Sequence, residues 1–350
     1  MRVVIADPPA YTPPYDHALA AALARRGVDV RLLTSRFRFG AVPVADGYAV
    51  DASLYALSGR VNHRVGRLGL KAVEHPLALV RLARVDCDVL HLQWVAAPEV
   101  DRWLLRTRAP LVFTAHDLVP RRTAQKTSAW LRLFSRFDRV ITHSQRGRQT
   151  LEEFGVAATK LRVIPHPVFR GDVSREDDGR TVLALGTIRP YKGLADAVDA
   201  VVAVAEARLL VAGDPRIPLD DLRRTAGKRA EWRLGYLGEA EISRALAAAT
   251  VAVFPYHPEL DQSGALLQAL GAGIPSVVYD VGGLGEVVRS FGAGRVVPSG
   301  DVAGLAEALR ELLHDPSALA DARAGAERAR ETLTWERSAA AHIAVYEEIL

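Results

Sequence analysis

Two short stretches in the second half of the sequence carry residues of the kinds that bind phosphate and sugar groups. In the first, "LGTIRPYKGL", an apolar run ends at Gly186, and Arg189 and Lys192 lie in the loop before a helical pattern. Two cations three residues apart near a helix N-terminus suit a diphosphate, because arginine binds phosphate oxygens in a bidentate manner and lysine acts as a point charge. A surface loop with solvated side chains is the alternative. The spacing differs from that of a P-loop, G-x-x-x-x-G-K-[S/T].

The second stretch is "DQSGALLQALGAGIPSVVYDVGG", residues 261–283. Asp261 or Ser263 can cap the helix that begins there, and the free N–H groups of its first turn form an anion site. Those N–H groups belong to Gly264, Ala265 and Leu266. Glycine at the helix start lets a ligand approach the backbone closely. Gln268, one turn into the helix, can bond a pair of hydroxyl groups or serve as an ordinary half-buried amide.

Strand and helix patterns alternate along the chain, and these elements must position both stretches. Short β-branched runs such as "RVVIA", "DVLHLQ", "TVLALG" and "VAVFPY" are separated by helical segments, which predicts βαβ units and parallel sheets. The alternation stops at residues 165–179, "PHPVFRGDVSREDDG", which is typical of a linker. A chain of 350 residues also exceeds a single core. We predict an α/β protein with Rossmann-like domains at 1–166 and 167–330, followed by a terminal helix at 331–350.

Ligands of such sheets bind beyond the carboxyl ends of the strands. His116 and Asp117 follow one predicted strand in the first domain, just as Gly186 and Thr187 follow one in the second. We therefore expect these residues at the ligand-binding edges of their sheets. For His116, a purely structural role is the alternative.

Composition excludes several classes of protein. With one cysteine, Cys87, the chain has neither a disulfide framework nor a cysteine zinc site, which favours a reducing cytosol. No window reaches the roughly 18 apolar residues of a membrane span, and the N-terminal strand-like run is too short for a signal segment. The histidines lack metal-ligand spacing, and "DCD" at 86–88 precedes a strand. We expect a cytoplasmic, metal-independent protein without a cofactor.

The charge is unevenly distributed. Residues 1–165 contain 25 Arg and Lys against 14 Asp and Glu, a net charge of +11, whereas the remainder carries −7. A basic half favours an anionic membrane surface, an anionic acceptor or nucleic acid, and a solvated Arg-rich surface is the simplest alternative. No nucleic-acid recognition motif is present, so we expect no nucleic-acid partner.

Several stretches together resemble the retaining glycosyltransferases of family four, which have the GT-B fold. They are "HLQW", "TAHDLVP", "RVITHSQRGRQTLEEFGVAATKLRVIPHP", "GTIRPYKGL" and "DQSGALLQALGAGIPSVVYDVGGLGEVV". The closing "TWERSAAAHIAVYEEIL" is similar to the terminal helix that crosses back to the N-terminal domain in GT-B enzymes. The resemblance implies two Rossmann-like domains facing a cleft, and a retaining hexosyltransferase that moves a sugar from a nucleotide-diphosphate sugar to an acceptor hydroxyl.

The resemblance also assigns roles to residues on the donor side. Arg189 and Lys192 match the cations on the donor diphosphate, although Thr187 stands where the family usually has an arginine directly after the glycine at 186. The backbone from Ser263 to Leu266 matches the loop and helix start that hold the phosphate and the sugar. The leaving phosphate is expected to accept the acceptor's proton, so that no strong base is needed.

Two positions depart from the E-x7-E motif of this family. Gln268 matches the second glutamate, which binds the ribose diol, and an amide can still bond that diol. Strict spacing places Leu260 at the first glutamate, which contacts the transferred sugar, whereas alignment on Gly264 places Asp261 there. We favour Asp261, because a carboxylate can reach sugar hydroxyls and a leucine cannot.

The remaining assignments follow from the same resemblance. His116 matches a histidine near the reacting sugar, and Glu286 is expected to brace the Gly-Gly loop that precedes it. Tyr11, Tyr15 and Asp117 are expected to shape the acceptor site.

Other functions stay open at this point. A weak or inactive nucleotide-sugar-binding partner protein is favoured by the loss of both motif glutamates. A GT-B nucleotide-sugar epimerase would need acid and base carboxylates, for which the sequence offers mainly Asp117 and Asp261. A lipid-linked acceptor, reached by peripheral membrane contact of the basic domain, agrees with the charge, and so does a small natural product.

Overall fold

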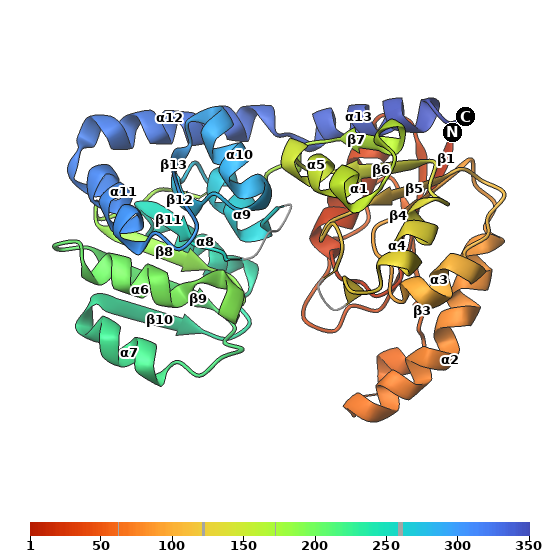
Figure 1. Cartoon of the computed structure of the whole chain (residues 1–350), viewed down its shortest axis with the longest axis horizontal. Coiled ribbons are helices and arrows are strands. Elements are labelled where there is room, and N and C mark those ends of the chain that lie inside the picture. The colour runs from red at the N-terminus through yellow and green to blue at the C-terminus, as the bar shows by residue number, and fades with distance from the viewer. Residues whose placement is uncertain (62, 121–122, 172, 258–261) are drawn as a thin grey trace. The chain divides into compact units, whose positions relative to one another are not determined.

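The computed structural model describes the chain except residues 62, 121–122, 172 and 258–261. It divides into two compact units (Figure 1), which are described separately. The N-terminal unit comprises Met1–Pro165 and Trp335–Leu350, and the C-terminal unit comprises His166–Thr334.

The N-terminal unit is built on a parallel sheet of seven strands in the order β3-β2-β1-β4-β5-β6-β7. The strands are β1 (Arg2–Asp7), β2 (Asp29–Ser35), β3 (Ala49–Leu54), β4 (Val89–Leu92), β5 (Leu111–Thr114), β6 (Arg139–Thr142) and β7 (Leu161–Val163). The order reverses at β1, which pairs with both β2 and β4. Ligands of doubly wound sheets bind at such a reversal.

Helices cover both faces of this sheet because successive residues of a strand point to opposite sides. The α-helices of the unit are α1 (Pro13–Arg25), α2 (Arg64–Ala83), α3 (Pro98–Leu104), α4 (Thr127–Phe134), α5 (Gln145–Phe154) and α13 (Trp335–Glu347). The 3-10 turns that lie wholly within the described residues include η1 (Ser58–Arg60) and η3 (Ala158–Lys160). Val3 and Ile5 pack with α1 and α13, whereas Val4 and Ala6 pack with α2 and α4 on the other face.

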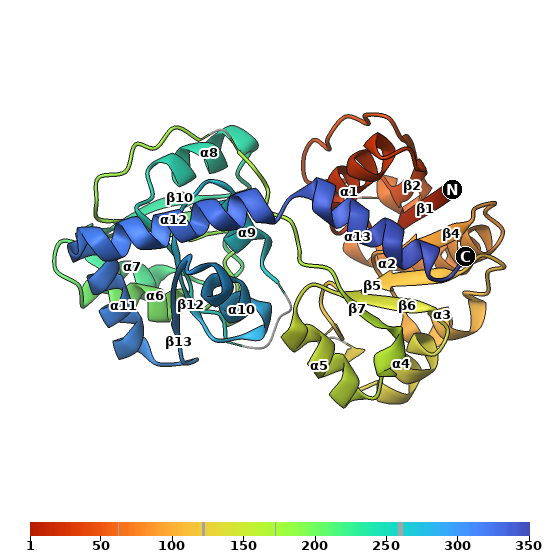
Figure 2. The same ribbon diagram turned by 90° about the horizontal axis from the view of Figure 1, so that it is seen from above.

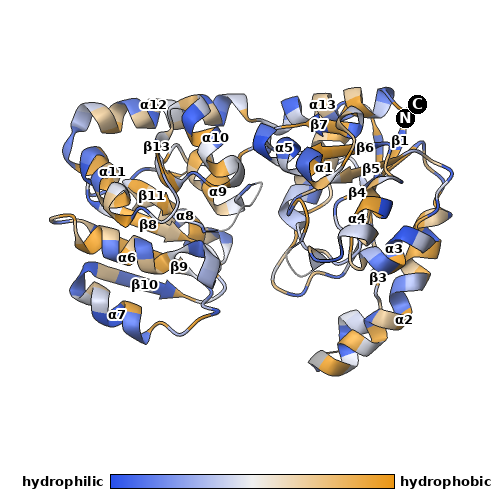
Figure 3. Cartoon of the chain, viewed as in Figure 1, coloured by the Kyte–Doolittle hydropathy of each residue, from blue (hydrophilic) through white to orange (hydrophobic). Residues whose placement is uncertain are grey.

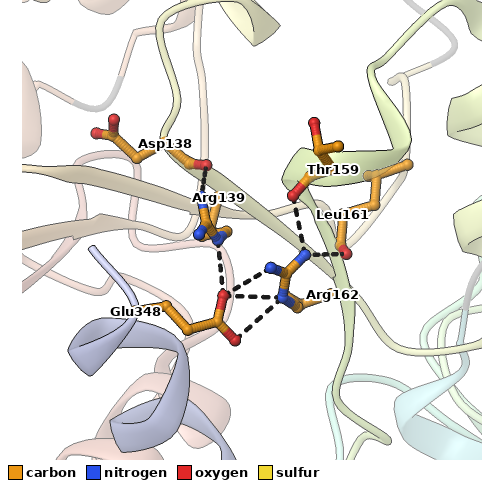
Figure 4. Close-up of polar contacts among 6 residues, drawn as sticks. All are labelled: Asp138, Arg139, Thr159, Leu161, Arg162 and Glu348. Carbon is orange, nitrogen blue, oxygen red and sulfur yellow. Dashed lines mark hydrogen bonds and ion pairs between the residues drawn. The ribbon is translucent and has the colours of Figure 1, made fainter.

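The C-terminal helix α13 is part of the N-terminal unit and packs along α1, as both views show (Figure 2). Its end is anchored by Glu348, whose carboxylate accepts hydrogen bonds from Arg139 Nε at 2.9 Å and Arg162 Nη2 at 2.7 Å (Figure 4). The Tyr346 hydroxyl lies 2.7 Å from Nδ1 of the buried His91. These contacts confirm the prediction that the terminal helix returns to the N-terminal domain.

The C-terminal unit has a parallel sheet of six strands in the order β10-β9-β8-β11-β12-β13. The strands are β8 (Thr181–Leu185), β9 (Arg208–Gly213), β10 (Ala230–Leu234), β11 (Val251–Phe254), β12 (Ser276–Tyr279) and β13 (Gly294–Val297). Its helices are α6 (Leu194–Val202), α7 (Asp220–Ala226), α8 (Glu239–Ala247), α9 (Gly264–Gly271), α10 (Gly282–Phe291), α11 (Val302–His314) and α12 (Pro316–Thr332). The 3-10 turns are η4 (Pro190–Lys192) and η5 (Gly227–Arg229).

Two apolar layers hold this second sheet. One layer joins α6, α11 and the start of α12 to one face, and the other joins α8, α9 and α10 to the opposite face. The central strands are accordingly apolar along their length (Figure 3). Both sheets are therefore doubly wound, as the alternation of strand and helix patterns predicted.

Within the described residues, no helix is both long and apolar enough to cross a membrane.

Candidate functional site

The loop after β8 places the first pair of predicted cations at the carboxyl edge of the C-terminal sheet. Gly186 turns the chain with a φ of +105°, and its N–H donates to the carbonyl of Ala212 at 2.8 Å. The Ile188 N–H then donates to Asp214 O at 2.8 Å, so the loop runs alongside the end of β9. Arg189 precedes η4 and is exposed, whereas Lys192 ends η4 and is half-buried.

Lys192 extends back over this loop. Its Nζ lies 3.3 Å from the position that a Cβ atom on Gly186 would occupy, and the Ala265 Cβ lies 3.5 Å from the same position. The ammonium also lies 4.8 Å from the ring centroid of Tyr256, which follows β11. Two connections at one sheet edge, the β8–α6 loop and the segment from β11 to the start of α9, therefore meet around a single cation.

A pocket opens beside the Lys192 side chain, and Thr187 contributes to its lining. Among the described residues that line it there is no Asp or Glu. A half-buried ammonium with no carboxylate in the described lining is suited to an anionic ligand, because burial favours pairing of the charge.

Close backbone packing against the end of β9 fixes the position of the loop after β8. A methyl group added at Gly213, the last residue of β9, would lie 2.1 Å from the carbonyl oxygen of Gly186. That distance is far shorter than any contact a real Cβ atom makes, so the two strand ends lie as near as they do only because residue 213 is glycine.

The start of α9 matches the predicted anion site in part. Ser263 is the N-cap, and its hydroxyl accepts the Leu266 N–H at 3.4 Å and lies 3.2 Å from the Tyr256 hydroxyl. Gly264 is exposed and Ala265 half-buried, so the first turn is accessible. Asp261, the favoured sugar-binding carboxylate, lies outside the described residues.

Gln262, which sequence reasoning missed, has an unusual environment. Its amide Nε2 donates to the carbonyl of Gly283 at 3.4 Å, and its Oε1 is buried without a partner among the described residues. A buried acceptor of this kind costs free energy unless a ligand satisfies it. Only its position directly before the cap could have marked it in the sequence. Gln268 and Glu286 are both half-buried, on α9 and α10 respectively.

A second missed group braces the η4 segment. The Asp196 carboxylate, in the first turn of α6, accepts a hydrogen bond from the Tyr279 hydroxyl at 2.8 Å and lies 3.0 Å from His257 Nε2. The backbone N–H of His257 in turn donates to the carbonyl of Tyr191 at 2.8 Å. These bonds connect the ends of β11 and β12 to the turn that carries Lys192.

In the N-terminal unit, His116 follows β5 and is half-buried in a cluster of rings. Its Nε2 lies 2.9 Å from Gln93 Oε1, an acceptor, so Nε2 carries a proton. The imidazole stacks on Trp94, with centroids 5.4 Å apart and planes at 16°. Tyr15 packs edge-on against it at 4.7 Å. The His116 ring is thus held in one orientation.

The predicted acceptor residues differ in exposure. Tyr11 is 51% exposed and packs edge-on against Trp94, while Asp117 is exposed beside His116. Tyr15 is only 2% exposed and lies beneath His116 and against Trp335. At this burial Tyr15 can shape the acceptor site only through the rings it supports, and that role stays a prediction. Tyr15 is buried because it lies on the side of α1 that packs against α13.

A pair of buried carboxyls sets the loop that carries Tyr11. Asp7 ends β1 and Asp16 lies on α1, and both are almost fully buried. The Thr12 N–H donates to Asp7 Oδ2 at 3.0 Å, and its hydroxyl donates to Asp16. Burial raises the pKa of both carboxyls, and their mutual repulsion raises the pKa of Asp16 further. Through their bonds to Thr12 the two carboxyls hold the ends of the loop together.

Within the described residues, no group of three or more His, Cys, Asp and Glu is placed to hold a metal ion.

Models of two protein families match the chain, one in each half. Residues 15–169 match Glycosyltransferase Family 4, and residues 179–315 match Glycosyl transferases group 1.

Individual relatives agree with this result. A glycogen synthase of Mycobacterium tuberculosis is 28% identical over 380 residues, covering 94% of this chain and 89% of the relative. A 2-deoxystreptamine glucosyltransferase of Streptomyces kanamyceticus is 33% identical over 184 residues, covering 50% and 47%. Among solved structures, sucrose-phosphate synthase of Thermosynechococcus elongatus superposes with a TM-score of 0.78 at 20% identity, covering 99% and 98%. Anabaena HepE, in complex with UDP and glucose, superposes with a TM-score of 0.72 at 18% identity, covering all of both chains.

These similarities agree with the motifs quoted above and with the two doubly wound sheets. The chain belongs to glycosyltransferase family 4, group 1, with the GT-B fold, and is a retaining enzyme that transfers a sugar from a nucleotide-sugar donor.

Proposed function

We propose that this chain transfers a hexose from a uridine-diphosphate sugar to an acceptor hydroxyl, with the C-terminal unit holding the donor. The observation that carries the donor side is the position of Lys192 over Gly186 and beside the start of α9. A uridine nucleotide is proposed because HepE, which shares the fold, was solved with UDP and glucose.

The diphosphate is proposed to lie between the Lys192 ammonium and the N–H groups that begin α9. Lys192 lines the pocket, Ala265 of the first turn of α9 lies against Gly186 beside it, and carboxylates are absent from the described lining. Charge-assisted hydrogen bonds to phosphate are roughly twice as strong as neutral ones. Arg189 is exposed at the start of η4 and is proposed to contact the outer phosphate oxygens.

The sugar and the ribose are proposed to contact amide groups in this chain. Gln262 offers a buried acceptor with no partner among the described residues, which suits a sugar hydroxyl. Gln268 is half-buried one turn along α9 and is proposed to bond the ribose diol. Glu286 is proposed to brace the start of α10. The role of Asp261 toward the sugar stays a prediction.

Chemistry at this site needs charge stabilisation and orientation more than a strong base. The leaving diphosphate gains negative charge as the glycosidic bond breaks, and Lys192 with the α9 N-terminus would stabilise that charge. The attacking hydroxyl approaches the face of the sugar from which the diphosphate leaves, and the same phosphate accepts its proton. His116, whose ring is held in one orientation by Gln93 and Trp94, is proposed to lie near the reacting sugar.

Calorimetric titration of the full chain with a panel of nucleoside diphosphates tests the donor assignment. We expect UDP to bind most tightly, and Lys192→Ala to weaken UDP binding by about tenfold or more. Lys228→Ala is the matched control, because Lys228 is an exposed lysine of the same unit that does not line the pocket.

The outcomes separate the competing functions. Binding of none of the nucleotides, with the control folded, would exclude a donor site altogether. Binding of UDP without sugar transfer to any acceptor preparation would favour the partner-protein alternative. Interconversion of UDP-sugars without an acceptor would favour the epimerase.

We also propose that the N-terminal unit contacts an anionic membrane at the cytoplasmic face, through one side of α2. Five apolar residues of this helix are 37% to 72% exposed, on about half of its circumference: Val65, Leu68, Val73, Leu77 and Val80. An exposed apolar stripe on a helix of a basic unit is typical of peripheral membrane binding.

Vesicle sedimentation tests this contact. Leu68→Glu/Leu77→Glu should abolish co-sedimentation with vesicles that contain phosphatidylglycerol, because two charges would enter the apolar layer. Val202→Glu, at an exposed valine of the C-terminal unit, should leave it unchanged. Equal sedimentation of all variants would contradict the membrane contact.

A further inference from the structure

A second pocket lies at the carboxyl edge of the N-terminal sheet, apart from the residues assigned to the donor. The loops after β1 and β2 form one wall, and η1 with the first turns of α2 forms the other. This is the edge beside β1, where the strand order reverses. Tyr11 lines the pocket, as does Phe39, which is 62% exposed.

The lining of this pocket is strongly basic. Its cations are Arg36, Arg38, Arg67 and Lys71. No Asp or Glu belongs to the described lining. Arg67 and Lys71 are four residues apart on α2 and hence one above the other on the same side of the helix. Burial lowers the pKa of Lys71, and repulsion by Arg67 lowers it further.

Glu74 of α2 and Arg38 of the pocket lining both contact backbone groups. The one acidic side chain of the described α2 residues, Glu74, binds the backbone N–H groups of Leu57 at 2.7 Å and Ser58 at 2.9 Å. The Arg38 guanidinium donates to the carbonyl of Val61 at 3.1 Å, which is a neutral acceptor. An anion in the pocket would therefore relieve repulsion among several cations.

The pocket wall around Lys71 is built rigidly. Its Nζ lies 5.0 Å from the ring centroid of Tyr55. The Tyr55 hydroxyl lies 2.7 Å from His75 Nδ1, and His75 Nε2 lies 2.6 Å from the Asp101 carboxylate. Asp101 in turn accepts the Ala97 N–H at 2.9 Å. This chain of bonds fixes the aromatic platform on which the ammonium rests.

Backbone strain is concentrated in the same place. Ala10 has a φ of +52° and Tyr55 a φ of +51°, a region that residues with a side chain rarely adopt. Both residues line the pocket. Strained backbone of this kind persists where the surrounding structure imposes it, and it gathers at ligand sites.

From this geometry we infer that the pocket binds a phosphate group of the acceptor, held by Arg67 and Lys71 from α2 and by Arg36 and Arg38 from the loop after β2. The inference rests on the proposed function, because it names the chemistry of the acceptor. Tyr11 and Phe39 offer ring faces to the remainder of the acceptor. The phosphate belongs either to a soluble phosphate ester or to a lipid headgroup, and the opposite side of α2 bears the exposed apolar residues.

Two probes distinguish these sources in the full chain. Calorimetry with glycerol 3-phosphate measures binding of a soluble phosphate ester, and sedimentation with phosphatidylcholine vesicles, with and without phosphatidylglycerol, measures binding of a lipid phosphate. The test variant is Arg67→Ala/Lys71→Ala. Arg84→Ala is the control, because Arg84 is an exposed arginine at the C-cap of α2 and does not line the pocket.

We expect the double variant to weaken binding of one probe by about tenfold or more relative to wild type and to Arg84→Ala. An effect on glycerol 3-phosphate assigns a soluble phosphate ester, and an effect on phosphatidylglycerol vesicles alone assigns a lipid headgroup. Equal binding by the double variant and the control in both measurements overturns the inference.

UDP binding is measured in the same proteins and separates this inference from the proposed function. The double variant should bind UDP as wild type does, because its substitutions lie in the other unit. If the double variant binds both phosphate probes as the control does while UDP binding is intact, only the assignment of the phosphate pocket is refuted. Absence of UDP binding in wild type, with the phosphate effect intact, refutes the donor assignment alone.

Discussion

The substitution Lys192→Ala tests the donor site most directly. It removes a half-buried ammonium that lies over Gly186 and 4.8 Å from the Tyr256 ring, while the backbone of η4 is retained. The variant should fold, because a cation–π contact of this kind contributes only about 0.5–1 kcal/mol. Any large effect on turnover therefore reflects the lost charge.

The expected fall in kcat/KM follows from the step at which the charge is needed, which is the departure of the diphosphate. Removing one donor that stabilises developing negative charge typically lowers the rate by roughly 10²–10³. We expect kcat/KM to fall at least about a hundredfold, which corresponds to about 2.7 kcal/mol of transition-state stabilisation. Arg189 and the α9 N-terminus remain, so turnover should not vanish.

Initial rates of UDP release from the UDP-sugar that binds best provide the assay. Lys192→Arg should recover part of the loss, since it restores the charge with a different shape. Lys228→Ala should behave as wild type. Near-normal turnover of Lys192→Ala would refute the assignment of this lysine to the diphosphate, whatever the nucleotide.

Three further predictions concern the frame around the sites. Gly213→Ala should weaken UDP binding and lower the melting temperature, because its Cβ would lie 2.1 Å from Gly186 O; unchanged calorimetry and melting would contradict that packing. Burial lowers the pKa of His143 and of His342 to about 4, whereas an unfolded histidine titrates near 6.5. The unfolded chain therefore binds more protons below about pH 6.5, and the unfolding free energy should fall by roughly 2 kcal/mol per ring between pH 7 and 5 in urea titrations. Glu348→Ala, which breaks two partly exposed ion pairs, should cost about 1 kcal/mol or less, with a smaller loss at high salt in the same measurement.

Much of the fold follows from local sequence. Most strands are short apolar runs and most helices are periodic, so the alternation alone predicts parallel sheets with helices on both faces. The places where the chain turns at strand ends are also local, since they need small or capping residues. Gly186 and Ser263 stand at such ends, which is why the sheet edge proposed to hold the donor could be picked out from the sequence.

Residues that act through distant partners could not be predicted in this way. Tyr256 lies under Lys192, and Gln262 bonds to Gly283, because two βα connections end at the same sheet edge. Tyr15 is expected from the sequence to shape the acceptor site, and the return of α13 buries it against Trp335. No local pattern records which segment returns to cover another.

The basic N-terminal half illustrates both sides of this division. Its net charge is fixed by composition, and so is its preference for anionic partners. Whether those charges are dispersed or gathered depends on which helix face is turned toward which loop. The tertiary structure brings Arg36 and Arg38, on the loop after β2, beside Arg67 and Lys71 of α2. Electrostatic attraction acts through space rather than along the chain, so the sequence determined the sign of the charge and only the fold decided where it is concentrated.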